Sequence, residues 1–194
     1  MSTRCLITKQ TEKGKYKTIY CHFDGYISGV GAVLDANYDT KEKVDGLLSL
    51  GDISSLCETL AETREKAYDP KAYPARHYNE EDLENPDLGV GFVYVYVAAG
   101  LWRVYLVNSQ TWGYLPDLLK AQGIESKFAS RWDAALKAAK DGDAYEQMKE
   151  AEKEGSLVDL LFNAFDILSD EDYEPLKQRW SEVWASHCFY KKEK

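Results

Sequence analysis

The stretch at residues 89–109, GVGFVYVYVAAGLWRVYLVNS, carries the strongest strand signal in the chain. Two runs rich in β-branched and aromatic residues flank a short Ala-Ala-Gly turn, a pattern typical of a β-hairpin. A second pair of apolar runs, at 5–8 and 16–23 around the turn TEKGK, predicts another hairpin. We therefore expect an α+β fold in which an antiparallel sheet of hairpins packs against helices.

Helical signals lie between the two hairpins. A short helix is expected over 31–38, and Asp39 with Glu42 forms a capping-box pattern for a helix that Gly51 ends. A further helix is predicted over 52–68, beginning at Asp52 or Ser54. Residues 69–89 contain three prolines and an acidic cluster, so this segment is expected to be a long exposed loop.

After Trp112 the pattern is helical throughout. The sequence thus predicts an α+β domain at 1–113, followed by a helical C-terminal portion at 114–194. Near the end of the chain, Trp180 and Trp184 share one helix face, which indicates either a core seam or the contact of a homodimer.

Composition limits the classes of function. The net charge of −9 and the pI near 4.9 oppose a broad nucleic-acid-binding surface. No apolar run approaches 18 residues and the start has no signal-peptide pattern, so we expect a cytoplasmic protein without a membrane span. Four scattered cysteines form neither a zinc pattern nor a disulfide framework. No metal or cofactor is predicted.

Strand alternation predicts one candidate binding surface. Side chains two apart share a face, which sets Tyr20, His22 and Asp24 opposite the apolar trio Ile19, Cys21 and Phe23, which is expected to face a core. If both hairpins share one sheet, their polar and aromatic side chains form a face that suits a planar ligand with a phosphate. Its members are Tyr20, His22, Asp24, Tyr94, Tyr96, Arg103 and Tyr105. The alternative is that these tyrosines pack under helices and that Asp24 builds a turn.

Enzyme chemistry has thin support in the sequence. The three histidines are far apart, and no metalloprotease, nucleophile-elbow or P-loop motif is present. Two enzymatic alternatives stay open: an N-terminal nucleophile at Ser2, and a nucleotide hydrolase that uses His22 and Asp24. No catalytic residue is assigned.

Three segments of the sequence together resemble those of one family of proteins. The start MSTR, IYCHFDGYISGVG at 19–31 and EKVDGLLSLGDISSL at 42–56 together resemble a family of small bacteriophage and prophage proteins with an IYCHWDGYP-like motif. The resemblance covers roughly residues 1–110, and Phe23 and Ile27 replace the usual Trp and Pro. The family is largely uncharacterised, so it implies no catalytic residues.

Three hypotheses about function stay open. The first two draw on the resemblance, by analogy with other phage accessory proteins, and the third rests on the residues alone. The first is a non-enzymatic inhibitor in the host cytoplasm that binds a host defence protein. Its candidate contact residues are Glu80, Glu81, Asp82, Glu84, Trp180 and Trp184. The second is a sponge that sequesters a nucleotide-derived immune signal on the aromatic face. The third is one of the two hydrolases above.

Overall fold

The computed structural model describes residues 3–86, 89–98 and 100–131. The chain divides into two compact units, residues 1–128 and 129–194, and the fold described below is that of the first. The first unit thus extends beyond residue 113. The predicted C-terminal helices, with Trp180 and Trp184, lie outside the described residues.

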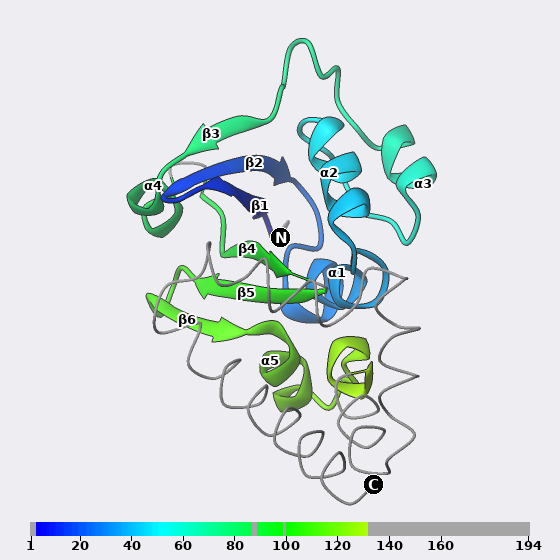
Figure 1. The fold of residues 1–194 in the computed structure, drawn as a ribbon, viewed down its shortest axis with the longest axis vertical. Helices are drawn as coiled ribbons and strands as arrows, with labels where there is room; N and C mark the ends of the chain where they lie inside the picture. Colours follow the sequence, from blue (N-terminus) through cyan, green and yellow to red (C-terminus); the bar gives the residue numbers. More distant parts are fainter. Residues whose placement is uncertain (1–2, 87–88, 99, 132–194) are drawn as a thin grey trace, which may run out of the picture. The chain divides into compact units, whose positions relative to one another are not determined.

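Within the described residues, six strands form one sheet (Figure 1). Its spatial order is β3-β2-β1-β4-β5-β6. The strands are β1 (Cys5–Glu12), β2 (Lys15–Cys21), β3 (Arg76–Tyr78), β4 (Phe92–Ala98), β5 (Leu101–Leu106) and β6 (Thr111–Tyr114). Both expected hairpins, β1–β2 and β4–β5, are confirmed by their antiparallel registers.

The two hairpins meet through β1 and β4, which run parallel. The fold is α+β, but the sheet is mixed, so the prediction of a purely antiparallel sheet is wrong. A parallel pair needs a long crossover connection, and the segment between Cys21 and Phe92 supplies it. No local pattern marks such a pairing, because it joins strands that are distant in the chain.

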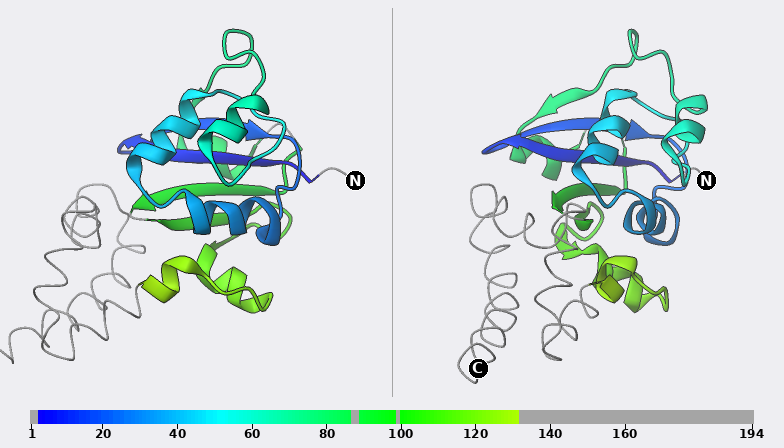
Figure 2. Two further views of the ribbon diagram at one scale, coloured as in Figure 1. Left: turned by 90° about the vertical axis from the view of Figure 1, so that its right-hand side faces the viewer. Right: turned by 45° about the vertical axis from the view of Figure 1, so that its right-hand side comes forward.

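The helices are short and flank the sheet. A π-helical turn, η1 (Ile27–Gly31), leads directly into α1. The α-helices are α1 (Ala32–Asn37), α2 (Lys41–Ser49), α3 (Leu60–Glu65), α4 (Glu80–Glu84) and α5 (Leu115–Ala121). Figure 2 shows α1, α2 and α3 on one side of the sheet. Leu83 of α4 belongs instead to the apolar cluster on the opposite face.

Three helix and loop predictions need correction. The cap of α2 is Thr40, whose hydroxyl accepts from the Lys43 amide, while Asp39 pairs with the Lys43 side chain at 2.7 Å. Residues 52–68 form a helix only over α3, because Thr59 opens it with its own capping box. The expected loop at 69–89 contains β3 and α4, and α4 begins at a capping box of Asn79 and Asp82.

The main core lies between the helices and the first sheet face. Tyr94 and Trp102 are fully buried there. Their polar atoms are satisfied by backbone carbonyls: the Tyr94 hydroxyl donates to Gly25 at 3.0 Å, and the Trp102 indole donates to Tyr38 at 3.3 Å. These two bonds attach the segment before α2 to the central strands.

Glycines in the segment 19–31 allow neighbouring stretches of backbone to approach closely. A Cβ on Gly25 would lie 2.7 Å from the carbonyl carbon of Arg4, and a Cβ on Gly29 would collide with the carbonyl oxygen of Asp24. Asp24 itself adopts a left-handed backbone conformation, with φ of 57°. Much of this motif therefore has a structural role: it forms the tight turn that leads from β2 into η1.

No helix within the described ranges is both long enough and apolar enough to span a bilayer.

Replacing Tyr94 with Phe tests the link between the motif and the sheet. We expect Tyr94→Phe to lower the free energy of unfolding by about 1–2 kcal/mol, because the buried Gly25 carbonyl loses its donor. Chemical denaturation measures this change. The exposed Tyr26 provides the control, Tyr26→Phe, which should leave the midpoint unchanged. Equal midpoints for both variants would contradict the assigned role of the hydroxyl.

Candidate functional site

The predicted aromatic face is divided between the two sides of the sheet. Tyr94 pairs with Val104 and faces the helices, where it is fully buried, and Tyr96 lies in the same core. Tyr105 and Tyr20 belong to the cluster on the opposite face. The prediction of one shared face is therefore wrong, and the alternative of tyrosines packed under helices holds for Tyr94 and Tyr96.

The reason is the register of the second hairpin. Val93 lies opposite Tyr105 and Val95 opposite Arg103, so Arg103 and Tyr105 share the side of the β4 valines. The register shifts between Tyr96 and Ala98, and one extra residue in a strand reverses which side chains share a face. The alternation within each strand was predictable, but the phase between the strands was not.

Arg103 and Tyr105 form a cluster with Trp112. The Arg103 guanidinium carbon lies 4.4 Å from the Trp112 ring centroid, a cation–π contact, and the Tyr105 ring packs on the same indole at 5.0 Å. The Trp112 indole donates to the Glu84 carboxylate at 2.9 Å. One member of the acidic cluster is thereby attached to this side of the sheet.

The other acidic residues of this cluster lie on exposed positions of α4. Glu80, Glu81 and Asp82 occupy its first turn, where negative charge is favourable, and Asp82 also accepts from the Asn79 amide at 2.8 Å. Part of the acidity of this segment therefore stabilises a helix start. Its predicted role as a contact surface stays a prediction.

Tyr20 and His22 do come together, as the alternation predicts. The Tyr20 hydroxyl and His22 Nδ1 are 2.9 Å apart, and the Phe23 ring packs edge-on against the imidazole at 4.5 Å between centroids. Burial raises the pKa of the Tyr20 hydroxyl, while the nearby Arg4 charge acts in the opposite direction. The cation that influences this site is thus Arg4, not the predicted Arg103.

A buried carboxylate, that of Asp52, holds the backbone of Tyr20 in place. Asp52, only 3% exposed, accepts the backbone N–H of Tyr20 at 2.9 Å and forms an ion pair with Arg76 Nη2. The other guanidinium nitrogen, Arg76 Nη1, is buried and has no hydrogen-bond partner in the part of the chain that the structure describes. Burying such a donor unpaired is costly.

Two further aromatic side chains extend this surface. Tyr68 influences the Tyr20 pKa and packs on Tyr73 at 5.6 Å between ring centroids. Phe23, Tyr68 and Tyr73 are 44%, 38% and 54% exposed, which is unusual for large apolar rings. We define the aromatic patch as Tyr20, His22, Phe23, Tyr68 and Tyr73. Sequence reasoning missed Tyr68 and Tyr73, whose one available signal was two tyrosines flanking Pro70. The expectation that Phe23 faces the core is wrong, because β2 ends at Cys21 and strand alternation no longer sets the side of Phe23.

Backbone hydrogen bonds hold the segments of the aromatic patch side by side. Phe23 N–H donates to Ser54 at 2.9 Å, and Ser54 N–H donates to Lys66 at 2.8 Å. Asp52 is bonded on both sides, since it donates to Tyr73 at 3.0 Å and accepts from Tyr68 at 2.9 Å. The patch therefore lies on segments that are joined by a ladder of backbone hydrogen bonds, which fixes the backbone that carries the rings.

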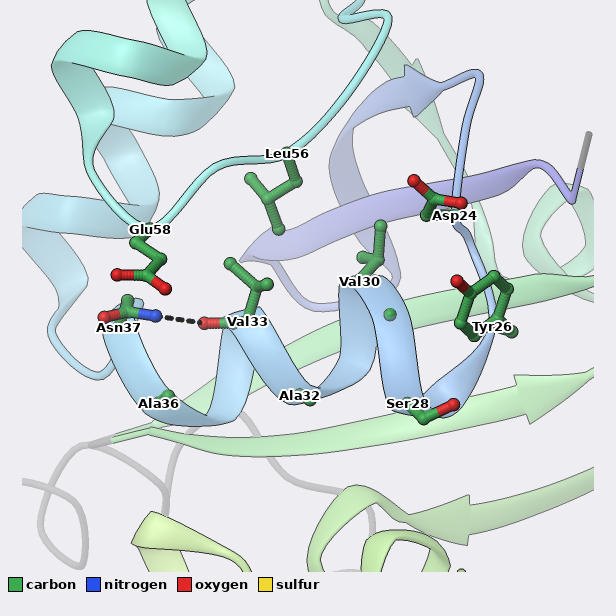
Figure 3. Close-up of a pocket in the computed structure, with 11 residues that line it drawn as sticks. Asp24, Tyr26, Ser28, Val30, Ala32, Val33, Ala36, Asn37, Leu56 and Glu58 are labelled. Carbon is green, nitrogen blue, oxygen red and sulfur yellow. Dashed lines mark hydrogen bonds between the residues drawn. The ribbon is translucent and has the colours of Figure 1, made fainter. Parts of the chain in front are cut away.

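A separate pocket opens over η1 and α1 (Figure 3). Its volume is about 350 Å³, within the lower range of small-molecule sites. Val30, Val33 and Leu56 line its middle, and the carboxylates of Asp24 and Glu58 lie toward its two ends (Figure 3). Of the predicted binding residues, Asp24 lies here and not with Tyr20. Glu58 had no distinguishing sequence signal.

The described residues bear on the metal-binding and hydrolase chemistry considered in the sequence analysis. They contain no group of three or more His, Cys, Asp or Glu side chains that could hold a metal ion. Ser2, the predicted N-terminal nucleophile, lies outside the described residues. The pair of His22 and Asp24 is divided, because Tyr20 holds the imidazole while Asp24 faces the pocket.

Comparison with protein-family models, with curated proteins and with solved structures finds no match to this chain. The likeness to a phage family stays a prediction from the motifs alone.

Replacing Asp52 tests the support behind the patch. Asp52→Ala should destabilise the protein by roughly 3 kcal/mol, because it leaves the Tyr20 amide and the Arg76 guanidinium without their acceptor. Asp52→Asn keeps one acceptor oxygen and should cost less. Urea denaturation provides the comparison, with the exposed Glu65→Ala as control. If Asp52→Ala unfolds at the same urea concentration as the control, Asp52 does not support the sheet edge.

Proposed function

We propose that this protein is a non-enzymatic phage accessory protein that inhibits a host antiviral defence system by binding a host defence protein. The observation that carries the proposal is the aromatic patch. Tyrosine and other aromatic side chains are enriched in the cores of protein–protein interfaces and dominate their binding energy. Exposed rings on a rigid ladder bind with little loss of conformational freedom, which favours affinity.

The charge of the protein supports a basic partner. The net charge of −9 accelerates association with a positively charged surface, such as the nucleic-acid-binding groove of a defence protein. In this proposal α4, with Glu80, Glu81 and Asp82, provides an acidic part of the contact, separate from the aromatic anchors. The predicted contacts at Trp180 and Trp184, and a homodimer through them, remain part of the proposal.

The aromatic anchors can be tested by phage plating. A host strain is given one defence system at a time, and the protein is expressed in trans. Where the protein restores plating, the triple variant Phe23→Ala, Tyr68→Ala, Tyr73→Ala should abolish rescue, because loss of each anchor weakens binding on the order of tenfold or more. Purified variants should melt within a few degrees of the unmodified protein, since all three rings are exposed.

A control and two contrary outcomes complete this test. Lys13→Ala, at the exposed tip of the β1–β2 hairpin, should leave rescue unchanged. A folded triple variant that still rescues plating would remove the patch from the interface. A protein that rescues plating against no defence system would overturn the proposed function itself.

A second candidate, a sponge for a nucleotide-derived signal, is favoured by a different observation. Arg76 Nη1, which has no hydrogen-bond partner among the described residues, offers a donor for a phosphate oxygen, and Tyr20 and His22 offer rings on which a base can stack. Asp52 links the two, because it pairs with Arg76 and accepts from the Tyr20 amide. Native mass spectrometry with a panel of cyclic dinucleotides should then give a one-to-one adduct. His22→Ala should lose that adduct, and Arg103→Ala, on the separate Trp112 cluster, should retain it. No adduct at all would leave the protein-binding proposal as the better one.

A further inference from the structure

The pocket over η1 and α1 has a simple charge pattern. Two carboxylates, Asp24 and Glu58, lie toward its opposite ends, and the stretch between them is lined by Val30, Val33 and Leu56 (Figure 3). No Lys or Arg is among the lining residues. Within the described ranges, neither carboxylate makes a side-chain hydrogen bond or an ion pair. The pocket therefore has two separated negative charges with an apolar surface between them.

Hydrogen bonds anchor the backbone segments that carry the two carboxylates. Asp24 is held in its left-handed conformation because its carbonyl accepts from Val30 at 2.8 Å and Gly29 leaves room for this close approach. Next to Glu58, the Cys57 carbonyl accepts from the Tyr38 hydroxyl at 3.0 Å and the Cys57 amide donates to Thr63 at 3.0 Å. The backbone of both segments therefore needs little reordering when a ligand binds.

We propose that this pocket binds an aliphatic polyamine, a chain of methylene groups with an ammonium at each end. The two ammonium groups pair with Asp24 and Glu58, and the methylene chain covers the valines and the leucine between them. A single cation neutralises one end and leaves the other carboxylate without a partner, so the pattern favours a ligand with two charges. The site is independent of the aromatic patch and of the proposed function.

Titration with amines of different charge tests the proposal. Putrescine is compared with n-butylamine, which has the same carbon chain and one ammonium group fewer, and with the longer spermidine, at constant ionic strength, and backbone amide shifts in NMR spectra are followed. We expect saturable shifts confined to residues 24–37 and 54–60, with putrescine bound at least fivefold more tightly than n-butylamine. The binding should weaken as salt is added, because exposed ion pairs are screened.

Two isosteric variants identify the charges. Asp24→Asn and Glu58→Gln should each reduce putrescine affinity to that of the monoamine, and both should fold, since Asn tolerates the left-handed backbone at position 24 and Glu58 is exposed. The controls, Glu65→Gln and Glu81→Gln, remove the same charge from exposed helix positions outside the pocket and should leave affinity unchanged.

Three results would overturn the polyamine site. The first is equal affinity for putrescine and n-butylamine. The second is a set of shifts spread over the acidic surface without saturation, which would indicate general counterion attraction. The third is a loss of affinity in Glu65→Gln or Glu81→Gln as large as that in the pocket variants.

Discussion

The hydrogen bond from the Tyr20 backbone amide to the Asp52 carboxylate completes the outer edge of the sheet. Strand β3 pairs with β2 only over residues 16–18, and the segment at 52–54 takes over beyond Tyr20. Between β3 and this segment, the Asp52 side-chain oxygen takes the place of a backbone carbonyl as the acceptor for the Tyr20 amide. The same carboxylate holds Arg76 of β3, so one residue joins the two segments that follow one another along this edge of β2. The aromatic patch depends on this junction, because its rings stand on the segments that meet there.

How much of the fold could be predicted depended on how far apart in the sequence the interacting residues lie. Both hairpins were predictable, because alternation and turn residues are local signals. The parallel join of β1 to β4 was not, since it brings together Cys5 and Phe92 without a local pattern. The acidic, proline-rich segment was misjudged for a related reason. Composition indicated a loop, whereas capping by Asn79 and the burial of Leu83 produce α4.

The candidate site shows the same limit at the level of side chains. The contact between Tyr20 and His22 followed from strand periodicity within one strand. Arg103 was assigned to their face because the shift beside Ala98 cannot be read from the sequence. Asp52 lies in a Gly-Asp-Ile-Ser-Ser-Leu segment that reads equally well as a helix start. Only its tertiary partners, Tyr20 and Arg76, distinguish the two interpretations.

The parallel pairing of β1 with β4 also governs the order in which the protein can form. Each hairpin closes from neighbouring residues and can assemble in microseconds, independently of the other. The centre of the sheet must wait until the long segment between the hairpins has been synthesised and folded back, which is an entropically slow closure. During that interval the inner edge of β1 is an open strand edge, the type of surface that associates with other chains. We infer that newly made chains depend on rapid completion of this crossover to avoid aggregation while translation is under way.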